Sequence, residues 1–422
     1  MSKYSTLTAR MKEEIINFSQ KISKGLGRPE QRLVGNMLYG ISAAESCVLT
    51  DIGRALHEEI KLKKTEERLA RGLRDFEGDD ELLRNFEPLA KEKLGTDPVF
   101  VLDESDLIKP YGQAFEGLAT VRDGSTGELG NGYWTLEVAA LTDETKTPIS
   151  LYDRVYSTVE DGYISQNDEL FKALRYIRKS YGQKGIRTLD RGFDRNIVYE
   201  YFLKADEEFI IRADKQRNVG HRGKNRNILE LANSYKGKYC LNFIGKKGEK
   251  LDCKLSVIPI HLPAYPSYSL NLITVYGLGK EPMMLVTNLR ESDKRLANTV
   301  AKVYLMRWRI EEHFRFKKQQ FDLEGFRVRS LSSIRTLHRL VTLLSGFVGL
   351  LADKHDSSMF VAELIHIANR INRSRKYWNY AVADGVAALL RLSHTGLRAK
   401  FKPKPKISQH QQIVFSAWTV LG

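Results

Sequence analysis

Cysteine is scarce in this sequence of 422 residues. The three cysteines, Cys47, Cys240 and Cys253, lie far apart and form no C-x-x-C pair. This pattern argues against a structural zinc site and against a disulfide framework, and it fits a reducing compartment. The nine histidines show no metal-ligand spacing, so we expect His313 to face DNA or solvent. A cytoplasmic location is expected.

Long hydrophobic runs are also missing. The longest nearly apolar run, "LVTLLSGFVGLLA", begins at Leu340 and is shorter than the roughly 20 residues that a membrane helix needs. The N-terminal segment "MSKYSTLTARMKEEIINFSQ" lacks the apolar core of a signal peptide. We therefore expect no membrane partner and interpret the run as a buried helix.

Charge of one sign is abundant. The chain has 67 Lys and Arg residues against 52 Asp and Glu residues, which gives a formal net charge of +15. Such an excess favours a polyanionic partner, because binding releases counterions from the polyanion. Nucleic acid is the leading candidate, although some basic proteins are merely soluble and basic. The length favours two or three structural units.

The first hundred residues are predicted to be helical. Four largely periodic stretches without proline lie at residues 11–24, 42–47, 51–59 and 65–76. Lys64, Arg68 and Arg71 fall on one face at helical spacing, so this segment is a candidate recognition helix that follows the 51–59 helix. The alternative is a small helical bundle with a solvated basic face.

An α/β pattern begins near residue 98. Apolar strand candidates such as "PVFVLD", "GYWTLEVAALT" and "ISLYDRVY" come first, and helix and strand then alternate through "IRTLD", "NIVYEYFLK" and "EEFIIRAD". This order indicates an α/β core with a mixed sheet. Residues 215–281 look like a β-rich insertion, after which "EPMMLVTNL" resumes the core sheet. Beyond residue 330 helices dominate, and "RAKFKPKPKISQHQQ" is predicted to be an exposed arm.

Two strand candidates end in an aspartate, Asp103 in "VFVLD" and Asp190 in "IRTLD". Carboxylates at the ends of neighbouring strands can converge on one point. An aspartate after a strand is also a common turn residue or helix cap. Nearby acids compete for the same role, and we prefer Asp103 because it directly ends the apolar run; the competitors are Glu104, Asp106 and Asp194.

The stretch "YLMRWRIEEHFRFKK" is predicted to be one continuous helix from Tyr304 to Lys318. At about 100° per residue, one narrow face carries Tyr304, Arg307, Glu311, Arg315 and Lys318. Met306 and Ile310 lie on the other side and are expected to bury against the sheet. Glu312 falls off the charged face and is the poorer candidate acid. The alternative is a solvated face held by pairs such as Glu311 with Arg315.

Three carboxylates from two strand ends and a helix are hard oxygen ligands, which suit Mg²⁺ or Mn²⁺ better than zinc. Two such ions about 4 Å apart can activate a water or a 3′-hydroxyl and stabilise the leaving oxygen of a phosphodiester. The bases on the same helix face would then clamp a phosphate backbone beside the metal site. We therefore interpret the acid as a metal ligand and the bases as DNA ligands.

These residues resemble a known family. The spacing Tyr304, Arg307, Glu311, Lys318 matches the Y-(2)-R-(3)-E-(6)-K signature of one class of bacterial insertion-sequence DDE transposases. "LDESDLIK" and "LDRGFD" are similar to the segments around the family's first and second aspartates. The resemblance covers about residues 99–330. It implies the triad Asp103, Asp190 and Glu311, two Mg²⁺ or Mn²⁺ ions per site, and a ribonuclease-H-like domain with a β-rich insertion.

The resemblance also implies residues for a hairpin step. In relatives that cut through a hairpin, an Arg after the second Asp and a Trp before the next core strand handle a flipped base. Arg212 resembles the former, whereas Met283 stands where the Trp is expected, which puts the hairpin step in doubt. Alternative stacking residues are Tyr265, Tyr268 and Trp308.

The sequence thus predicts a DNA transposase in three regions: a helical DNA-binding domain at residues 1–95, a catalytic domain at 96–330, and a helical region at 331–422 for dimerisation or DNA contact. It would cut the ends of its element and join them to target DNA, as a homodimer in the synaptic complex. Alternatives are a metal-dependent nuclease without strand transfer and an inactive DNA-binding protein derived from a transposase.

Overall fold

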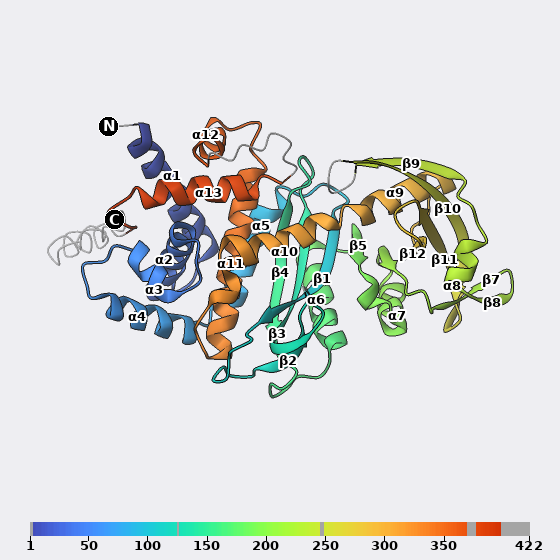
Figure 1. Cartoon of the computed structure of the whole chain (residues 1–422), viewed down its shortest axis with the longest axis horizontal. Coiled ribbons are helices and arrows are strands. Elements are labelled where there is room, and N and C mark those ends of the chain that lie inside the picture. Colours follow the sequence, from blue (N-terminus) through green and yellow to red (C-terminus); the bar gives the residue numbers. More distant parts are fainter. Residues whose placement is uncertain (1–2, 125, 245–248, 369–376, 398–422) are drawn as a thin grey trace, which may run out of the picture.

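A computed structural model of the chain describes residues 3–124, 126–244, 249–368 and 377–397. The molecule is elongated, with helices at one end, a sheet in the middle and a β-rich part at the other end (Figure 1). The arm predicted at residues 398–412 lies outside the described residues.

The central sheet is built from five strands in the order β4–β3–β1–β5–β6. Strand β1 (Val99–Ile108) pairs antiparallel with β3 (Leu129–Leu141), which pairs antiparallel with β4 (Pro148–Tyr156). On its other side β1 runs parallel to β5 (Ile186–Leu189), and β5 runs parallel to β6 (Phe209–Arg212). Three antiparallel strands followed by two parallel ones form a ribonuclease-H-like core, so the predicted fold class is confirmed. A short strand, β2 (Ala119–Arg122), extends the β3 edge.

The β-rich part continues this sheet. Strand β12 (Met283–Thr287) pairs antiparallel with β6, as the sequence predicted for "EPMMLVTNL". Beyond β12 come the long hairpin of β10 (Lys250–Leu262) and β11 (Tyr265–Tyr276), with β9 (Tyr239–Ile244) paired to β10. The remaining elements are β7 (Asn218–His221), β8 (Lys224–Asn227) and α8 (Ile228–Asn233).

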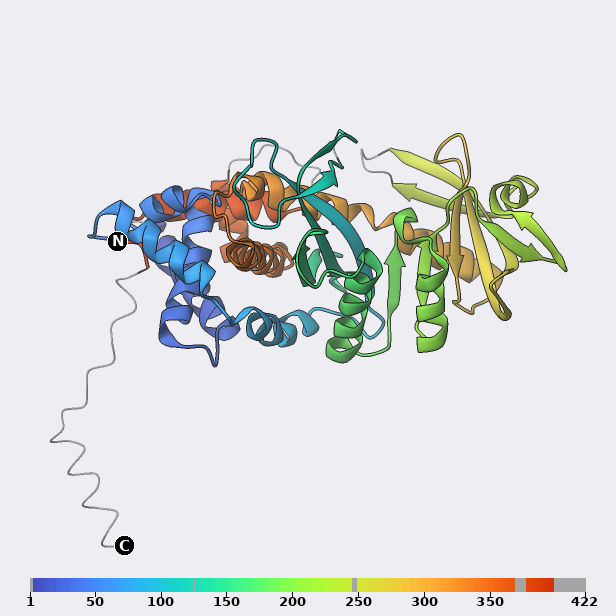
Figure 2. The same cartoon turned by 90° about the horizontal axis from the view of Figure 1, so that it is seen from below.

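Helices cover both faces of the central sheet. Helix α10 (Trp308–Gln320) crosses one face, while α6 (Gln166–Tyr181) and α7 (Asn196–Ala205) lie on the other (Figures 1 and 2). Ser165 caps the start of helix α6, because its hydroxyl accepts the Asp168 N–H. Gly182 caps the end of the helix with a φ of 88°, which favours glycine. Helix α9 (Asp293–Leu305) packs on the β-rich part.

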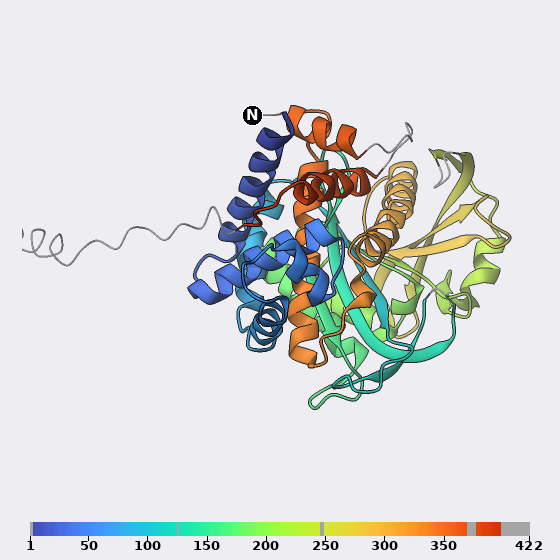
Figure 3. The ribbon, with the colours of Figure 1, turned by 60° about the vertical axis from the view of Figure 1, so that its left-hand side comes forward.

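The N-terminal helices pack against the C-terminal ones (Figure 3). Thr8 on α1 donates to the Leu389 carbonyl, and the Lys12 ammonium donates to the Gly396 carbonyl. Both groups share one hydrophobic core with the sheet. The predicted boundary at residue 95 therefore stays a prediction. The helices are α1 (Lys3–Ile22), α2 (Arg28–Ala44), α3 (Leu49–Ala55), α4 (Leu62–Arg74), α5 (Asp79–Lys91), α11 (Leu331–Ala352), α12 (Met359–Ile367) and α13 (Asn379–Arg391).

One sequence prediction for this region needs correction, and another, that the run from Leu340 is a buried helix, is confirmed. A helix at residues 42–47 is wrong, because α2 ends at Ala44 and Glu45 is left-handed with φ 53°. The apolar run from Leu340 belongs to α11. This helix is longer than the run and, by length and composition, is long and apolar enough to cross a membrane. Yet 89% of its most apolar window is buried inside the fold, as in the core helix of a soluble protein.

Candidate active site

Asp103 and Asp190 lie on neighbouring parallel strands. Leu102 on β1 is in register with Leu189 on β5, and each aspartate is the next residue along its strand. The prediction that strand β1 ends at Asp103 is wrong. The strand continues to Ile108, because β3 stays paired to it along this length. Asp190 does end its strand, and its carboxylate also accepts the Gly192 N–H at 2.8 Å as the cap of a short turn.

The predicted continuous helix from Tyr304 to Lys318 is wrong. Helix α9 ends at Leu305 and α10 begins at Trp308, with Met306 and Arg307 between them. Here the chain tightens to three-residue spacing, because the Ile310 N–H donates to the Arg307 carbonyl at 2.9 Å. The five side chains therefore come from two helices and the turn between them. The prediction that Ile310 buries against the sheet is confirmed by its packing on Val101.

Arg307 joins two of the predicted acids. One guanidinium nitrogen lies 2.5 Å from Asp103 Oδ2, and another lies 3.1 Å from Glu311 Oε1. The side chains of Arg307 and Asp103 are each 13% exposed, whereas that of Glu311 is 41% exposed. The bridge therefore fastens the start of α10 to the middle of β1.

The acids lie close enough to affect one another. Burial, opposed by Arg307 and reinforced by the negative charge of Asp190, raises the pKa of Asp103 to about 7. Glu311 contributes in the same direction. The structure thus brings Asp103, Asp190 and Glu311 into one electrostatic cluster, as expected for acids that share a cation.

Tyr304 is buried next to this cluster. Its ring centre lies 6.0 Å from the Arg307 guanidinium, and its hydroxyl lies beside Arg212 without a well-aligned hydrogen bond to the described residues. Burial raises the pKa of the Tyr304 hydroxyl. Tyr304 is therefore buried in this structure. It does not present an exposed surface for its predicted contact with DNA.

A pocket of about 250 Å³ opens beside the cluster. Its walls bring together residues from the strands and from the α9–α10 turn: Arg212, Met283, Tyr304, Arg307, Trp308 and Glu311. Of the alternative stacking residues, only Trp308 lines this pocket. Tyr265 lies beside Glu200 at the end of the long hairpin, and Tyr268 is exposed.

The other predicted bases on α10 are engaged in ion pairs. Lys318 lies 3.1 Å from Asp106 and 3.2 Å from Glu324, and Arg315 lies 2.6 Å from Glu312. The competing acids therefore have partners of their own. Glu104 accepts the Tyr156 hydroxyl at 3.0 Å, and Asp194 pairs with Arg217 at 2.6 Å.

The predicted N-terminal bases lie on α4 but differ in their surroundings, and their contact with DNA stays a prediction. Lys64 pairs with Glu67 at 2.8 Å, and Arg68 pairs with the buried Glu58 at 2.8 Å. Arg68 and Arg71 line a separate groove, and Lys64 is not among the residues that line it.

A buried ionic network that the sequence did not predict lies under the site. Glu137 is the cross-strand neighbour of Asp103, and Lys317 on α10 forms an ion pair with it. Although burial opposes ionisation, Lys317 holds the pKa of Glu137 well below its usual range. A lysine on a helix is normally read as exposed, so no signal in the sequence marked it.

The expectation that His313 faces DNA or solvent is wrong. The ring is fully buried and lies 2.7 Å from the Ser150 hydroxyl. Burial, with the nearby charge of Lys317, lowers the pKa of His313 to about 3. Because Ile310, His313 and Lys317 share the buried face of α10, the helix turns its other face, with Glu311, toward the cluster.

The donor set suits a divalent cation by chemistry, because three carboxylates supply hard oxygens. As arranged, Arg307 holds Asp103 Oδ2 and Glu311 Oε1. Within the described ranges, no three His, Cys, Asp or Glu side chains are placed to hold a metal ion. Arg307 therefore competes with any cation at this site for these two oxygens.

Comparison with known structures gives distant likenesses. A piggyBac transposase synaptic complex with hairpin DNA has a TM-score of 0.47 at 10% identity, covering 99% of this chain and 85% of that one. Endonuclease V from Ciona intestinalis, in complex with DNA, has a TM-score of 0.27 at 12% identity, covering 55% and 95%. The catalytic domain of human endonuclease V has a TM-score of 0.26 at 13% identity, covering 56% and 90%. Likenesses this distant say nothing about activity.

Comparison of sequences is more informative. No curated protein matches the chain. Residues 162–345 match the family described as the transposase DDE domain. This range begins after Asp103 and includes Asp190, Arg307 and Glu311. The match over residues 162–345 supports a DDE transposase.

Proposed function

We propose that this protein is a cut-and-paste DNA transposase of the bacterial insertion-sequence class with the Y-(2)-R-(3)-E-(6)-K signature. It binds the terminal inverted repeats of its own element, cuts the 3′ strand, and joins the new 3′-hydroxyl to target DNA. The observation that carries the proposal is the convergence of Asp103, Asp190 and Glu311, which come from two parallel strands and a helix. The sequence match of residues 162–345 to the transposase DDE domain supports it and includes Asp190 and Glu311.

Asp103, Asp190 and Glu311 are the proposed catalytic residues and the proposed ligands of Mg²⁺ or Mn²⁺, with two ions per site. Bound there, the ions would activate the attacking oxygen and stabilise the leaving oxygen of a phosphodiester. The chain's own part is to hold the three carboxylates near one another. The parallel register of β1 and β5 fixes the two aspartates, and the burial of Ile310 and Lys317 fixes the helix that carries Glu311.

The bases around the acids are proposed DNA ligands. Arg307 and Lys318 now pair with carboxylates, so a phosphate backbone would compete for guanidinium and ammonium groups that are already in place. Arg212 and Tyr304 would face the same DNA from the pocket beside Glu311. Arg315 extends this set along α10.

The partners are proposed to be the terminal repeats and target DNA, which the net charge of +15 supports. Two element ends require two active sites, so the synaptic complex would be a homodimer. We place the protein in the bacterial cytoplasm at the nucleoid. The regions 1–95, 96–330 and 331–422 are proposed to serve DNA binding, catalysis, and dimerisation or DNA contact.

The test uses the purified full chain, a labelled element end and Mg²⁺. Mapping the cut strand should show cleavage at the 3′ end of the element, and pre-cut ends should join to a target plasmid. Cleavage without joining would identify a metal-dependent nuclease. Binding without cleavage or joining would identify an inactive DNA-binding protein, and the absence of both binding and cleavage would refute the proposal.

A further inference from the structure

A second pocket lies away from the acid cluster, between the start of α2 and the last turns of α4. It has a volume of about 490 Å³. Four arginines line it, two from each helix, together with a small apolar floor and two acids; the residues are Arg28, Pro29, Glu30, Arg32, Leu33, Arg68, Arg71, Gly72 and Asp75. We call this pocket the arginine groove.

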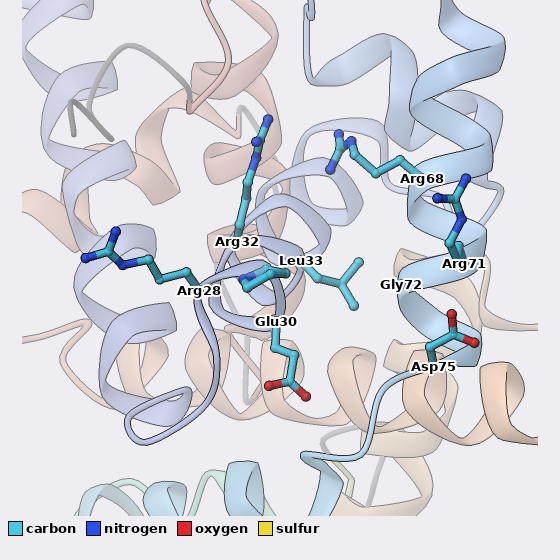
Figure 4. A pocket seen from close by; sticks show the side chains of 9 residues that line it. Arg28, Glu30, Arg32, Leu33, Arg68, Arg71, Gly72 and Asp75 are labelled. Atoms are coloured by element: carbon cyan, nitrogen blue, oxygen red, sulfur yellow. The ribbon is translucent and has the colours of Figure 1, made fainter.

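The positive and negative side chains of the arginine groove lie on different sides of the pocket. In Figure 4 the guanidinium groups of Arg32, Arg68 and Arg71 lie on the same side of the pocket, whereas the Glu30 and Asp75 carboxylates lie lower. Four arginines face two acids of the lining and the buried Glu58 beside it, which leaves the groove positive by one charge. A ligand with several negative groups is therefore expected on the arginine side.

The shape of the groove is set by close helix packing. A Cβ added to Gly72 would come within 2.9 Å of Leu33 Cδ1, so α4 approaches α2 more closely there than a larger residue would permit. Leu33 is buried at this contact and forms the apolar floor. The two helices thus hold their arginines at a fixed separation.

Glu58 fixes the direction of two of these arginines. Its side chain is only 3% exposed, and it lies 2.8 Å from Arg68 on α4 and 3.5 Å from Arg32 on α2. The Thr65 hydroxyl also donates to it at 2.8 Å. One buried carboxylate therefore orients guanidinium groups from both helices before any ligand binds, which lowers the entropy cost of binding.

Donor groups remain available after these contacts. A guanidinium has five N–H donors, and the hydrogen bond from Arg68 to Glu58 uses one of them. The Arg68 side chain remains 31% exposed. An oriented guanidinium with free donors is the group that binds phosphate best, because it can donate two parallel hydrogen bonds.

We propose that the arginine groove binds the sugar–phosphate backbone of duplex DNA, with Arg28, Arg32, Arg68 and Arg71 as phosphate ligands and the Leu33 floor against the sugars. The choice of DNA rests on the proposed function. This site differs from the helix face predicted from the sequence, because Arg28 and Arg32 on α2 replace Lys64.

The test measures binding of the full chain to random-sequence duplex DNA without divalent cations, over a series of salt concentrations. Backbone contacts do not depend on sequence, so random DNA is the appropriate probe. Arg32→Ala and Arg71→Ala should each weaken binding and reduce the slope of log K against log salt by about 0.9. Arg84→Ala is the matched control, because this exposed arginine on α5 pairs with Glu81 and does not line the groove.

Unchanged affinity and slope in both groove variants, with thermal midpoints like that of the wild type, would overturn the proposal. A larger loss in Lys64→Ala than in Arg71→Ala would also overturn it, in favour of the helix face. The outcome is separable from the proposed function. If the wild type cuts element ends with Mg²⁺ while the groove variants bind DNA normally, only the groove is wrong. If the groove variants lose binding while the wild type never cuts, only the transposase proposal falls.

Discussion

A guanidinium nitrogen of Arg307 lies 2.5 Å from a carboxylate oxygen of Asp103, although 204 positions separate the two residues in the sequence. The contact spans from the α9–α10 turn to the middle of β1 and is only 13% exposed on either side. The same guanidinium reaches Glu311. Arg307 therefore supplies the positive charge that the acid cluster needs in this arrangement, and it competes with any cation for the same oxygens.

The first prediction concerns this competition. Arg307→Ala should bind Mn²⁺ about tenfold more tightly than the wild type, because two carboxylate oxygens are released. Titration calorimetry without DNA measures this. Because Arg307 also lowers the pKa of Asp103, both proteins are titrated over a pH series, and the tenfold gain is expected where Asp103 is ionised in each. Arg315→Ala is the control, since Arg315 pairs with Glu312. Weaker Mn²⁺ binding in Arg307→Ala would show instead that Arg307 mainly holds the acids in place.

The second prediction concerns the triad. Asp103→Asn, Asp190→Asn and Glu311→Gln should each reduce end cleavage below detection, because each removes a charged oxygen donor. Binding to uncut ends should persist, since it depends on phosphate and base contacts elsewhere. Cleavage and gel-shift assays on the same preparations check this. Normal cleavage by Glu311→Gln, or loss only in Glu312→Gln, would refute the assignment of the helix acid.

The third prediction concerns Lys318 as part of the DNA clamp. Lys318→Ala should weaken binding of a pre-cleaved end and reduce the salt slope by about one. If Lys318 serves only its ion pairs with Asp106 and Glu324, the variant should lower the free energy of unfolding, because Asp106 is buried, and leave DNA binding alone. A salt series with the pre-cleaved end, together with urea unfolding, decides between the two.

The fourth prediction concerns the buried pair under the site. Lys317 and Glu137 are 1% and 2% exposed, so Lys317→Met should remove the main positive partner of a buried carboxylate, leave it only His338 and the Ser150 hydroxyl, and cost about 3–5 kcal/mol of stability. The double variant Lys317→Met, Glu137→Gln should recover much of this loss. Urea unfolding of the two single variants and the double variant measures the coupling. Additive losses would mean that the pair does not stabilise the fold as a unit.

The fifth prediction concerns pH. Burial disfavours the charged form of His338, but hydrogen bonding to Asp153 at 2.9 Å and the nearby Glu137 outweigh burial and raise the pKa of His338. A raised pKa in the folded state means that this stabilisation is fully present below about pH 6.5 and is lost as the pH rises through the folded value.

Urea unfolding over a pH series should therefore show a fall in the free energy of unfolding above pH 6.5 or so that is smaller in His338→Gln. Lys317 and Arg339 also face this network. The quantity to compare is therefore the pH dependence of the free energy of unfolding in the wild type and in His338→Gln. The same slope in both proteins would contradict the assignment to His338.

The sequence by itself determined the fold class and the candidate acids. Apolar strands followed by alternating helices and strands predicted the mixed sheet, because burial on both sides requires hydrophobic runs. The two aspartates were found because a charge directly after such a run stands out. The spacing from Tyr304 to Lys318 predicted Glu311 as the third acid, and these acids do converge in the structure.

Tertiary structure alone decided how the charges are used. Periodicity shows which face of a helix a residue occupies, but it carries no information about partners that are distant in the chain. The break between α9 and α10, the burial of Lys317 against Glu137, the bridge from Arg307 to Asp103 and the arginine groove all depend on such distant contacts. Whether a charged side chain is solvated, buried in a pair or aimed at a ligand is set by the groups packed around it, and these are fixed only when the chain has folded.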